Sequence, residues 1–143
     1  MSYEKRLEEY INFFEKLNKD VKIDKYAEIY EEHIYFEDPF QKTYTLNALY
    51  KIYEEMFQNL HKPEFKINEC AINQNIAYIQ WTFSFKMNEK SSFESITGVS
   101  RVEFAENGKV ISHIDYWDSS KNVFEKIPIL RNILIFIKNK IKT

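Results

Sequence analysis

The sequence predicts an α+β fold in which N-terminal helices pack against a meandering antiparallel sheet. Apolar side chains before residue 61 mostly recur at the three-to-four-residue spacing of helices. After Pro63 the pattern changes to the two-residue period of strands, and a hairpin signal at Asn107-Gly108 joins two of these strands. A run of helices followed by a run of strands is typical of α+β domains.

Composition limits the class of protein. The chain has 143 residues and a net charge of -2, which suits one globular domain and gives no bias toward nucleic acid. The single cysteine, Cys70, excludes an internal disulfide framework and a cysteine-rich zinc site. The N-terminus is too charged for a secretory signal, and no apolar run reaches the roughly 20 residues of a membrane helix, so we expect a cytoplasmic protein.

Three helices are expected before residue 61. The first covers residues 3–18, the second begins with Asp24 as its N-cap, and the third covers residues 45–60 with Thr45 as its cap. The apolar stripe of the third helix consists of Leu46, Leu49, Tyr50, Tyr53, Met56, Phe57 and Leu60.

Strands are expected at residues 33–38, 76–87, 93–104 and 110–118. The strand at 76–87 alternates most clearly, and its apolar face consists of Ala77, Ile79, Trp81, Phe83, Phe85 and Met87. Between the last two strands, Asn107-Gly108 tolerates the positive φ angles of a type I′ turn.

The stretch HIDYWD, residues 113–118, holds the most unusual polar side chains. In a strand, His113, Asp115 and Trp117 share one face. An Asp beside a His can hold the tautomer of the imidazole, which suits acid–base chemistry. The alternative is a surface pair, in which His113 and Arg101 meet Asp115 or Glu103 across neighbouring strands.

The stretch YFEDPF, residues 35–40, places Asp38 on one strand face with Phe36 and Phe40. Such a carboxylate either lies on a pocket wall or caps the turn that Pro39 opens. His33 and His61 lie singly near element ends and are expected in solvent. The sequence has no zinc-protease motif, phosphate-binding glycine loop or serine-hydrolase elbow, so neither a metal nor a cofactor is expected.

The C-terminal residues 126–143 predict a basic amphipathic helix. Its apolar stripe consists of Leu130, Ile133, Leu134, Ile137 and Ile141, and lysines lie mostly elsewhere. Such a helix can lie on an anionic membrane or a partner surface. The alternative is that it closes over the protein's own sheet or over a dimer interface.

These pieces together resemble the SnoaL-like family of the nuclear transport factor 2-like superfamily. The resemblance rests on YFEDPF, on the capped helix 45–60, and on the hairpin FAENGKVISHIDYWD. It implies a cone-shaped (cystatin-like) fold with a curved, mixed, mostly antiparallel sheet, and a homodimer. Residues 1–125 would form the SnoaL-like domain and residues 126–143 the C-terminal helix.

Comparison with ketosteroid isomerases in this superfamily matches Asp38 to their general base. Their oxyanion hole needs a tyrosine on the first helix and a protonated aspartic acid on a later strand. The corresponding positions here are Phe13 or Phe14 and a residue near Ser100, so steroid-type isomerisation is not expected. Limonene-epoxide hydrolases match Asp115, but residues 79–85 lack the Arg-x-Asp pair of that family. SnoaL-type polyketide cyclases use an acid in the same region, and either Asp115 or Asp38 suits that role.

The resemblance therefore implies a cone pocket for a small, largely apolar ligand and cofactor-free isomerase, cyclase or hydrolase chemistry. The sequence hypothesis makes Asp115 the acid–base group, poised by His113, and Asp38 a second carboxylate that orients the ligand. The predicted ligand-binding residues are Trp81, Trp117, Phe36, Phe40, Tyr53, Met56 and Phe57. The alternative is a non-catalytic binding module whose C-terminal helix docks a partner or a membrane surface.

Overall fold

The computed structural model describes residues 2–118. Its helices are α1 (Tyr3–Glu15), α2 (Ile23–Ile29) and α3 (Leu46–Asn59), and its strands are β1 (Tyr30–Asp38), β2 (Gln41–Thr43), β3 (His61–Asn73), β4 (Ile76–Lys86), β5 (Glu94–Phe104) and β6 (Val110–Tyr116). Within this part of the chain no helix is long and apolar enough to cross a membrane. The predicted basic helix 126–143, and the domain boundary before it, lie outside the described residues.

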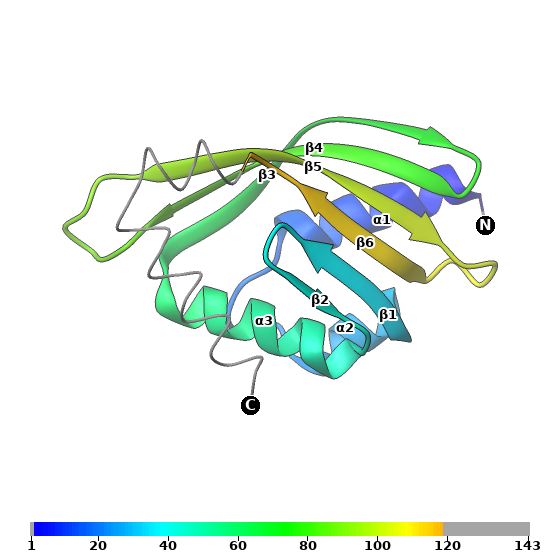
Figure 1. Ribbon diagram of the computed structural model, residues 1–143, viewed down its shortest axis with the longest axis horizontal. Helices are drawn as coiled ribbons and strands as arrows, with labels where there is room; N and C mark the ends of the chain where they lie inside the picture. The colour runs from blue at the N-terminus through cyan, green and yellow to red at the C-terminus, as the bar shows by residue number, and fades with distance from the viewer. Residues whose placement is uncertain (1, 119–143) are drawn as a thin grey trace.

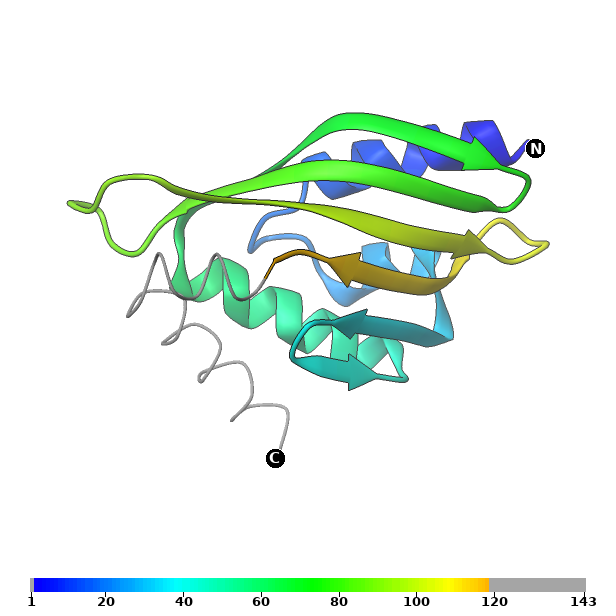
Figure 2. The same ribbon diagram turned by 45° about the horizontal axis from the view of Figure 1, so that its top comes forward.

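The strands form one mixed, curved sheet in the order β2-β1-β6-β5-β4-β3. Strands β1 and β6 pair in parallel, and every other neighbouring pair is antiparallel. Figures 1 and 2 show the helices together on one face of this sheet. The α+β class and the curved mixed sheet predicted from the sequence are confirmed. The parallel pairing brings the ends of YFEDPF and HIDYWD together.

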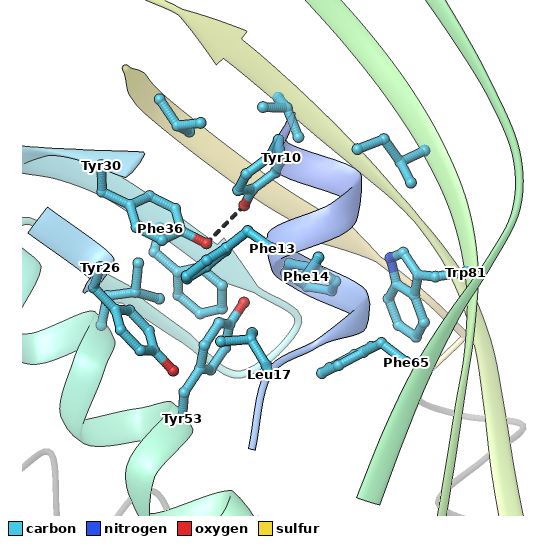
Figure 3. Close-up of a cluster of buried hydrophobic side chains, with 14 of the residues drawn as sticks. Tyr10, Phe13, Phe14, Leu17, Tyr26, Tyr30, Phe36, Tyr53, Phe65 and Trp81 are labelled. Carbon is cyan, nitrogen blue, oxygen red and sulfur yellow. Dashed lines mark hydrogen bonds between the residues drawn. The ribbon is translucent and has the colours of Figure 1, made fainter. Parts of the chain in front are cut away.

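The core lies between the sheet and the helices. Along β4 the burial alternates strictly, as the sequence predicts, and the buried side chains are Ala77, Ile79, Trp81, Phe83 and Phe85. Helix α1 contributes Leu7, Tyr10, Phe13 and Phe14, and helix α3 contributes Leu46, Leu49, Ile52, Tyr53 and Phe57. Figure 3 shows the rings of this core meeting between α1, α3 and the sheet. Aromatic side chains supply much of this buried apolar surface, which is the main stabilising contribution to folding.

Helix caps follow the sequence prediction at one helix and depart from it at another. Thr45 caps α3, because its hydroxyl accepts a hydrogen bond from the amide of Ala48 at 3.2 Å. The predicted cap Asp24 is wrong. Helix α2 starts at Ile23 after Lys22, which makes no side-chain cap, and Asp24 lies in the first turn, where its charge favours the helix dipole.

The hairpin between β5 and β6 is present, but its turn is not type I′. That turn needs positive φ at both central residues, whereas only Gly108 has one, at 86°. The amide of Gly108 donates to the carbonyl oxygen of Ala105 at 2.9 Å, and the amide of Ala105 donates to the carbonyl oxygen of Lys109 at 2.8 Å. The pairing register of β5 and β6 shifts between Glu103 and Phe104. These features describe a turn closed by a glycine bulge, which adds one residue to the connection.

Candidate functional site

A cavity of about 100 Å³ opens between helix α3, the end of β1 and the inner face of strands β4 to β6. One water needs roughly 10–15 Å³ by the same measure, so the cavity has room for a small organic molecule. Aromatic rings form most of its wall, from Phe36, Tyr53, Phe65, Trp81, Phe83, Phe85 and Trp117. In Figure 3, Tyr53 rises from α3 and Trp81 extends inward from β4. Mostly apolar walls with a few polar groups are typical of small-ligand sites.

Asp38 lies on this wall and also caps the turn after β1. Its Oδ1 accepts from the amides of Phe40 at 2.8 Å and Gln41 at 3.0 Å, and its Oδ2 accepts from Gln41 Nε2 at 2.8 Å. The two alternatives left open by the sequence are therefore both correct. Burial is the main cause that raises the pKa of Asp38 to about 6, the charge of Asp115 adds to it, and the hydrogen bonds only partly oppose it.

Asp115 reaches the same cavity from β6. Its Oδ1 accepts from Ser100 Oγ at 2.5 Å and is 2.7 Å from His113 Nε2. Ser100 in turn accepts from the indole Nε1 of Trp81 at 2.7 Å. Among the described residues nothing donates to the second oxygen, Oδ2, and the side chain is 15% exposed. One carboxylate oxygen is therefore fixed by the sheet, and the other is available to a ligand.

His113 stands behind Asp115, outside the cavity lining, and is 1% exposed. Its Nδ1 lies 2.6 Å from the hydroxyl of Tyr10, which is 2.8 Å from the hydroxyl of Tyr30. We assign the neutral Nε2–H tautomer, because then Tyr30 donates to Tyr10, Tyr10 donates to Nδ1, and Nε2 donates to Asp115. The predicted alternative of a surface pair across neighbouring strands is wrong, because His113 is buried and meets Asp115 on its own strand. Arg101 does contact Glu103, at 3.4 Å, but also within one strand.

A first-helix tyrosine does enter the polar network, but it is Tyr10 and not a residue at position 13 or 14. Burial raises the pKa values of Tyr10 and Tyr30 well above the ordinary value, so both hydroxyls stay protonated. Figure 3 marks the bond between them. Because the hydroxyl of Tyr10 is already bonded to Tyr30 and His113, it is not an open oxyanion donor.

Tyr53 supplies a polar group that has no partner. The side chain is 3% exposed, and its hydroxyl has no hydrogen-bond partner among the described residues. Burial raises its pKa well above the ordinary value, so it remains an O–H donor. The Oε1 of Gln41, another lining residue, is also buried and unpaired among residues 2–118. Buried polar groups without partners are unusual and mark places where a ligand can bond.

Of the predicted ligand-binding residues, five line the cavity: Trp81, Trp117, Phe36, Tyr53 and Met56. Phe40 lies outside the lining and packs on Trp117, with ring centroids 5.5 Å apart. Phe57 is a core residue that packs on Phe65 at 6.4 Å, so its place on the apolar stripe of α3 did not bring it to the cavity. The residues described hold no cluster of three side chains that would ligate a metal.

Gly98 shapes the cavity floor in a way the sequence did not indicate. It pairs with Trp81 across β4 and β5, and a Cβ atom at this position would lie 2.6 Å from the Trp81 ring and 2.9 Å from the carbonyl oxygen of Tyr116. The missing side chain lets the indole lie across β5 and reach Ser100. Ser100 was named only as the position of a lost acid, although it joins Trp81 to Asp115.

Comparison with known proteins agrees with this geometry. The SnoaL-like domain family matches residues 7–113. This chain belongs to that family. No protein with a curated description matches the sequence.

Solved structures show the same fold at low sequence identity. A candidate SnoaL-like polyketide cyclase from Jannaschia sp. CCS1 is 12% identical, with a TM-score of 0.72 over 87% of this chain and 94% of its own. A protein of unknown function from Exiguobacterium sp. 255-15, described as NTF2-like (nuclear transport factor 2-like), is 14% identical, with a TM-score of 0.66 over 79% of this chain and 98% of its own. A protein with a ketosteroid isomerase-like fold from Catenulispora acidiphila, solved in complex with trimethylamine, is 6% identical, with a TM-score of 0.66 over 80% of this chain and 85% of its own. This SnoaL-like chain therefore has the nuclear transport factor 2-like fold.

Proposed function

We propose that this SnoaL-like protein binds a small, largely apolar molecule that bears a carbonyl or hydroxyl group, and that it transfers a proton on that molecule without a cofactor. One observation carries the proposal. Asp38, with a pKa of about 6, lines the same aromatic cavity as Tyr53, whose hydroxyl has no partner in the part of the chain that the structure describes. An acid–base group is most effective when its pKa is close to the working pH.

The reaction class that suits these groups is proton transfer next to a carbonyl. Ionised Asp38 takes a proton from the carbon beside the carbonyl. The electron pair of that C–H bond forms the C=C bond of an enolate, and the π pair of the carbonyl moves to its oxygen. Tyr53 donates its hydroxyl hydrogen bond to the oxygen as negative charge develops there. When the enolate is conjugated with a C=C bond, return of the proton from Asp38 to the far carbon completes an isomerisation. When the enolate carbon attacks a second carbonyl within the ligand, a ring forms and the new alkoxide takes the proton back from Asp38.

This proposal exchanges the roles that the sequence hypothesis gives to the two acids. The pKa of about 6 favours Asp38 as the acid–base group. Asp115 has one oxygen held by His113 and Ser100, which suits a fixed group that orients the ligand through its other oxygen. His113 then acts as a positioning residue for Asp115, because it lies outside the cavity lining.

Relatives of the same fold support binding of a small molecule. The Catenulispora protein was solved with trimethylamine, and the Jannaschia protein is a candidate polyketide cyclase. The homodimer, the cytoplasmic location and the C-terminal helix remain predictions from the sequence.

Kemp elimination of 5-nitrobenzisoxazole tests the proposed base without knowledge of the natural substrate. A carboxylate base takes the C3 proton of the probe, the N–O bond breaks, and a coloured cyanophenolate is released. We expect turnover above that of acetate at equal concentration, because a carboxylate on an apolar wall is a stronger base than one in water. The turnover rate should rise with pH, and the midpoint of this rise should give an apparent pKa of about 6.

The matched variants are Asp38→Asn and Asp20→Asn, because Asp20 is exposed and does not line the cavity. The proposal is supported if Asp38→Asn loses turnover and Asp20→Asn does not. Equal rates in both variants and the unmodified protein would exclude Asp38 as the base. Probe binding without any turnover would favour the alternative function, a non-catalytic binding module.

A further inference from the structure

The cavity has an unbalanced charge. Its lining contains two carboxylates, Asp38 and Asp115, and no lysine, arginine or histidine among the residues that the structure describes. The imidazole of His113 lies behind Asp115, outside the lining, with its Nε2 2.7 Å from Asp115 Oδ1. Within the described residues the lining therefore offers two carboxylates and no cationic side chain.

Carboxylates beside apolar walls are unfavourable unless they are paired. Burial already raises the pKa of Asp38, and the charge of Asp115 adds to this shift. A ligand with a positive charge would offset both effects, whereas a ligand carboxylate or phosphate would add to them. The free Oδ2 of Asp115 is the oxygen positioned to pair with such a charge.

The aromatic wall of the cavity also favours a positively charged ligand. Indole and phenyl faces carry negative electrostatic potential and attract organic cations, and Trp binds them most strongly. Trp81 and Trp117 both line the cavity beside Asp115. The nitrogen of Trp81 already donates to Ser100, so it is not available as a donor to an anion.

A separate observation points to a ligand in this space. The Tyr53 hydroxyl has no partner within residues 2–118 although the side chain is 3% exposed, and both Asp38 and Asp115 contribute to its electrostatic surroundings. It remains a donor for a neutral oxygen at the other end of a ligand.

We propose that the ligand class of this cavity is a small organic ammonium compound that also bears an oxygen, with the cation against Asp115 and the two indoles and the oxygen against Tyr53. The inference uses the site of the proposed function but needs no turnover, so it stands or falls by binding alone.

Three probes of nearly the same shape test it by isothermal titration calorimetry on the full chain: choline, its neutral isostere 3,3-dimethylbutan-1-ol, and the anion 3,3-dimethylbutanoate. At about pH 7.5 a carboxyl group with a pKa of about 6 is ionised. We expect choline to bind at least about tenfold more tightly than the alcohol, and the anion to bind most weakly. If the alcohol binds as tightly as choline, or if no probe binds, the inference is wrong.

Variants separate charge from shape. Asp115→Asn should weaken choline binding at least about fivefold and leave binding of the alcohol within about twofold, because only the cation uses the charge. Trp117→Leu provides a second variant at a partly exposed position, and it should also weaken choline more than the alcohol. Asp20→Asn should change neither affinity. Equal losses for both probes in Asp115→Asn and Trp117→Leu would overturn the proposal.

Failure of this inference differs from failure of the proposed function. Kemp turnover that depends on Asp38, together with equal binding of choline and the alcohol, would retain the acid–base site and exclude the ammonium ligand. Selective choline binding without turnover would retain the ligand class and exclude the catalytic role. Loss of both results would show that the cavity is not a functional site.

Discussion

His113 Nε2 lies 2.7 Å from Asp115 Oδ1, and the two side chains have very different surroundings. His113 is 1% exposed and stacks near Phe14 and Phe36, whereas Asp115 is 15% exposed and lines the cavity. The pair therefore connects the aromatic core with the candidate site. The imidazole of His113 also bonds to the hydroxyl of Tyr10 on helix α1, which in turn bonds to Tyr30 on strand β1. The position of the Asp115 carboxylate therefore depends on both of these elements.

Replacement of His113 by alanine should destabilise the fold by about 3 kcal/mol or more. The change leaves a cavity, a Tyr10 hydroxyl without its acceptor and Asp115 without one donor, and each of these costs free energy. Urea denaturation measures the free energy of unfolding. His33→Ala, at an exposed position, is the control and should change it by less than about 0.5 kcal/mol. Similar effects of the two substitutions would contradict the assigned network.

Ser100 should couple energetically to Asp115. Ser100→Ala removes a donor to Asp115 and leaves the indole N–H of Trp81 without its acceptor, at a cost of about 1–3 kcal/mol. In a double-mutant cycle with Asp115→Asn, we expect an interaction energy of at least about 0.5 kcal/mol. Additive effects would show that the Ser100 hydroxyl does not stabilise the carboxylate. Ser92→Ala, at an exposed position, is the matched control.

Asp38→Asn should make the protein more stable at neutral pH. The pKa of Asp38 is about 6 in the folded protein against 3.8 for the ordinary carboxyl, so between these values the folded state binds more protons than the unfolded state. The contribution of Asp38 to the free energy of unfolding therefore falls by about 2–3 kcal/mol as pH rises from about 4 to 6, and stays low above 6.

The Asp38→Asn variant does not lose this free energy of unfolding as the pH rises, and asparagine can still accept the backbone hydrogen bonds of the turn. The difference in unfolding free energy between variant and unmodified protein should grow in favour of the variant across that pH window, by about 2 kcal/mol. Chemical denaturation at several pH values measures it, with Asp20→Asn as the reference for an exposed carboxylate. A difference that is constant with pH would mean that Asp38 has an ordinary pKa.

Gly98→Ala should displace the indole of Trp81. The new Cβ would meet both the ring and the carbonyl of Tyr116, and backbone on one side leaves little room to adjust. Overpacking of this kind costs about 1–3 kcal/mol. Tryptophan fluorescence and the melting temperature report the change, and Thr97→Ala on the exposed face of β5 is the control. An unchanged emission spectrum would show that Trp81 does not depend on the glycine.

The sequence predicted the parts of the fold that depend on local periodicity. The strict alternation from Ile76 to Lys86 and the apolar stripe of α3 require only neighbouring residues, and both elements form as expected. The turn at Gly108 and the start of α2 differ by small shifts of one or two residues. Such shifts depend on turn closure and packing rather than on residue preference alone.

The site was predicted in part. Asp38, Asp115 and Trp117 share strand faces that alternation identifies, and all three reach the cavity. The links that hold them were not predictable, because Tyr10 and His113 are separated by 103 residues and meet only through packing of α1 on the sheet. Phe57 was predicted to line the cavity but lies in the core. The apolar stripe of α3 supplies residues to both places, and the sequence pattern does not show which residue goes to which.

Titration of the Asp38 side-chain carboxyl carbon by carbon-13 NMR measures the pKa on which the proposed role of this group depends. Comparison with Asp38→Asn assigns the resonance, and the exposed Asp20 carboxyl serves as an internal reference. We expect a midpoint at about pH 6 for Asp38 in the folded protein. A midpoint near the ordinary value of 3.8 would contradict it, because Asp38 would then be a turn cap and not an acid–base group at neutral pH.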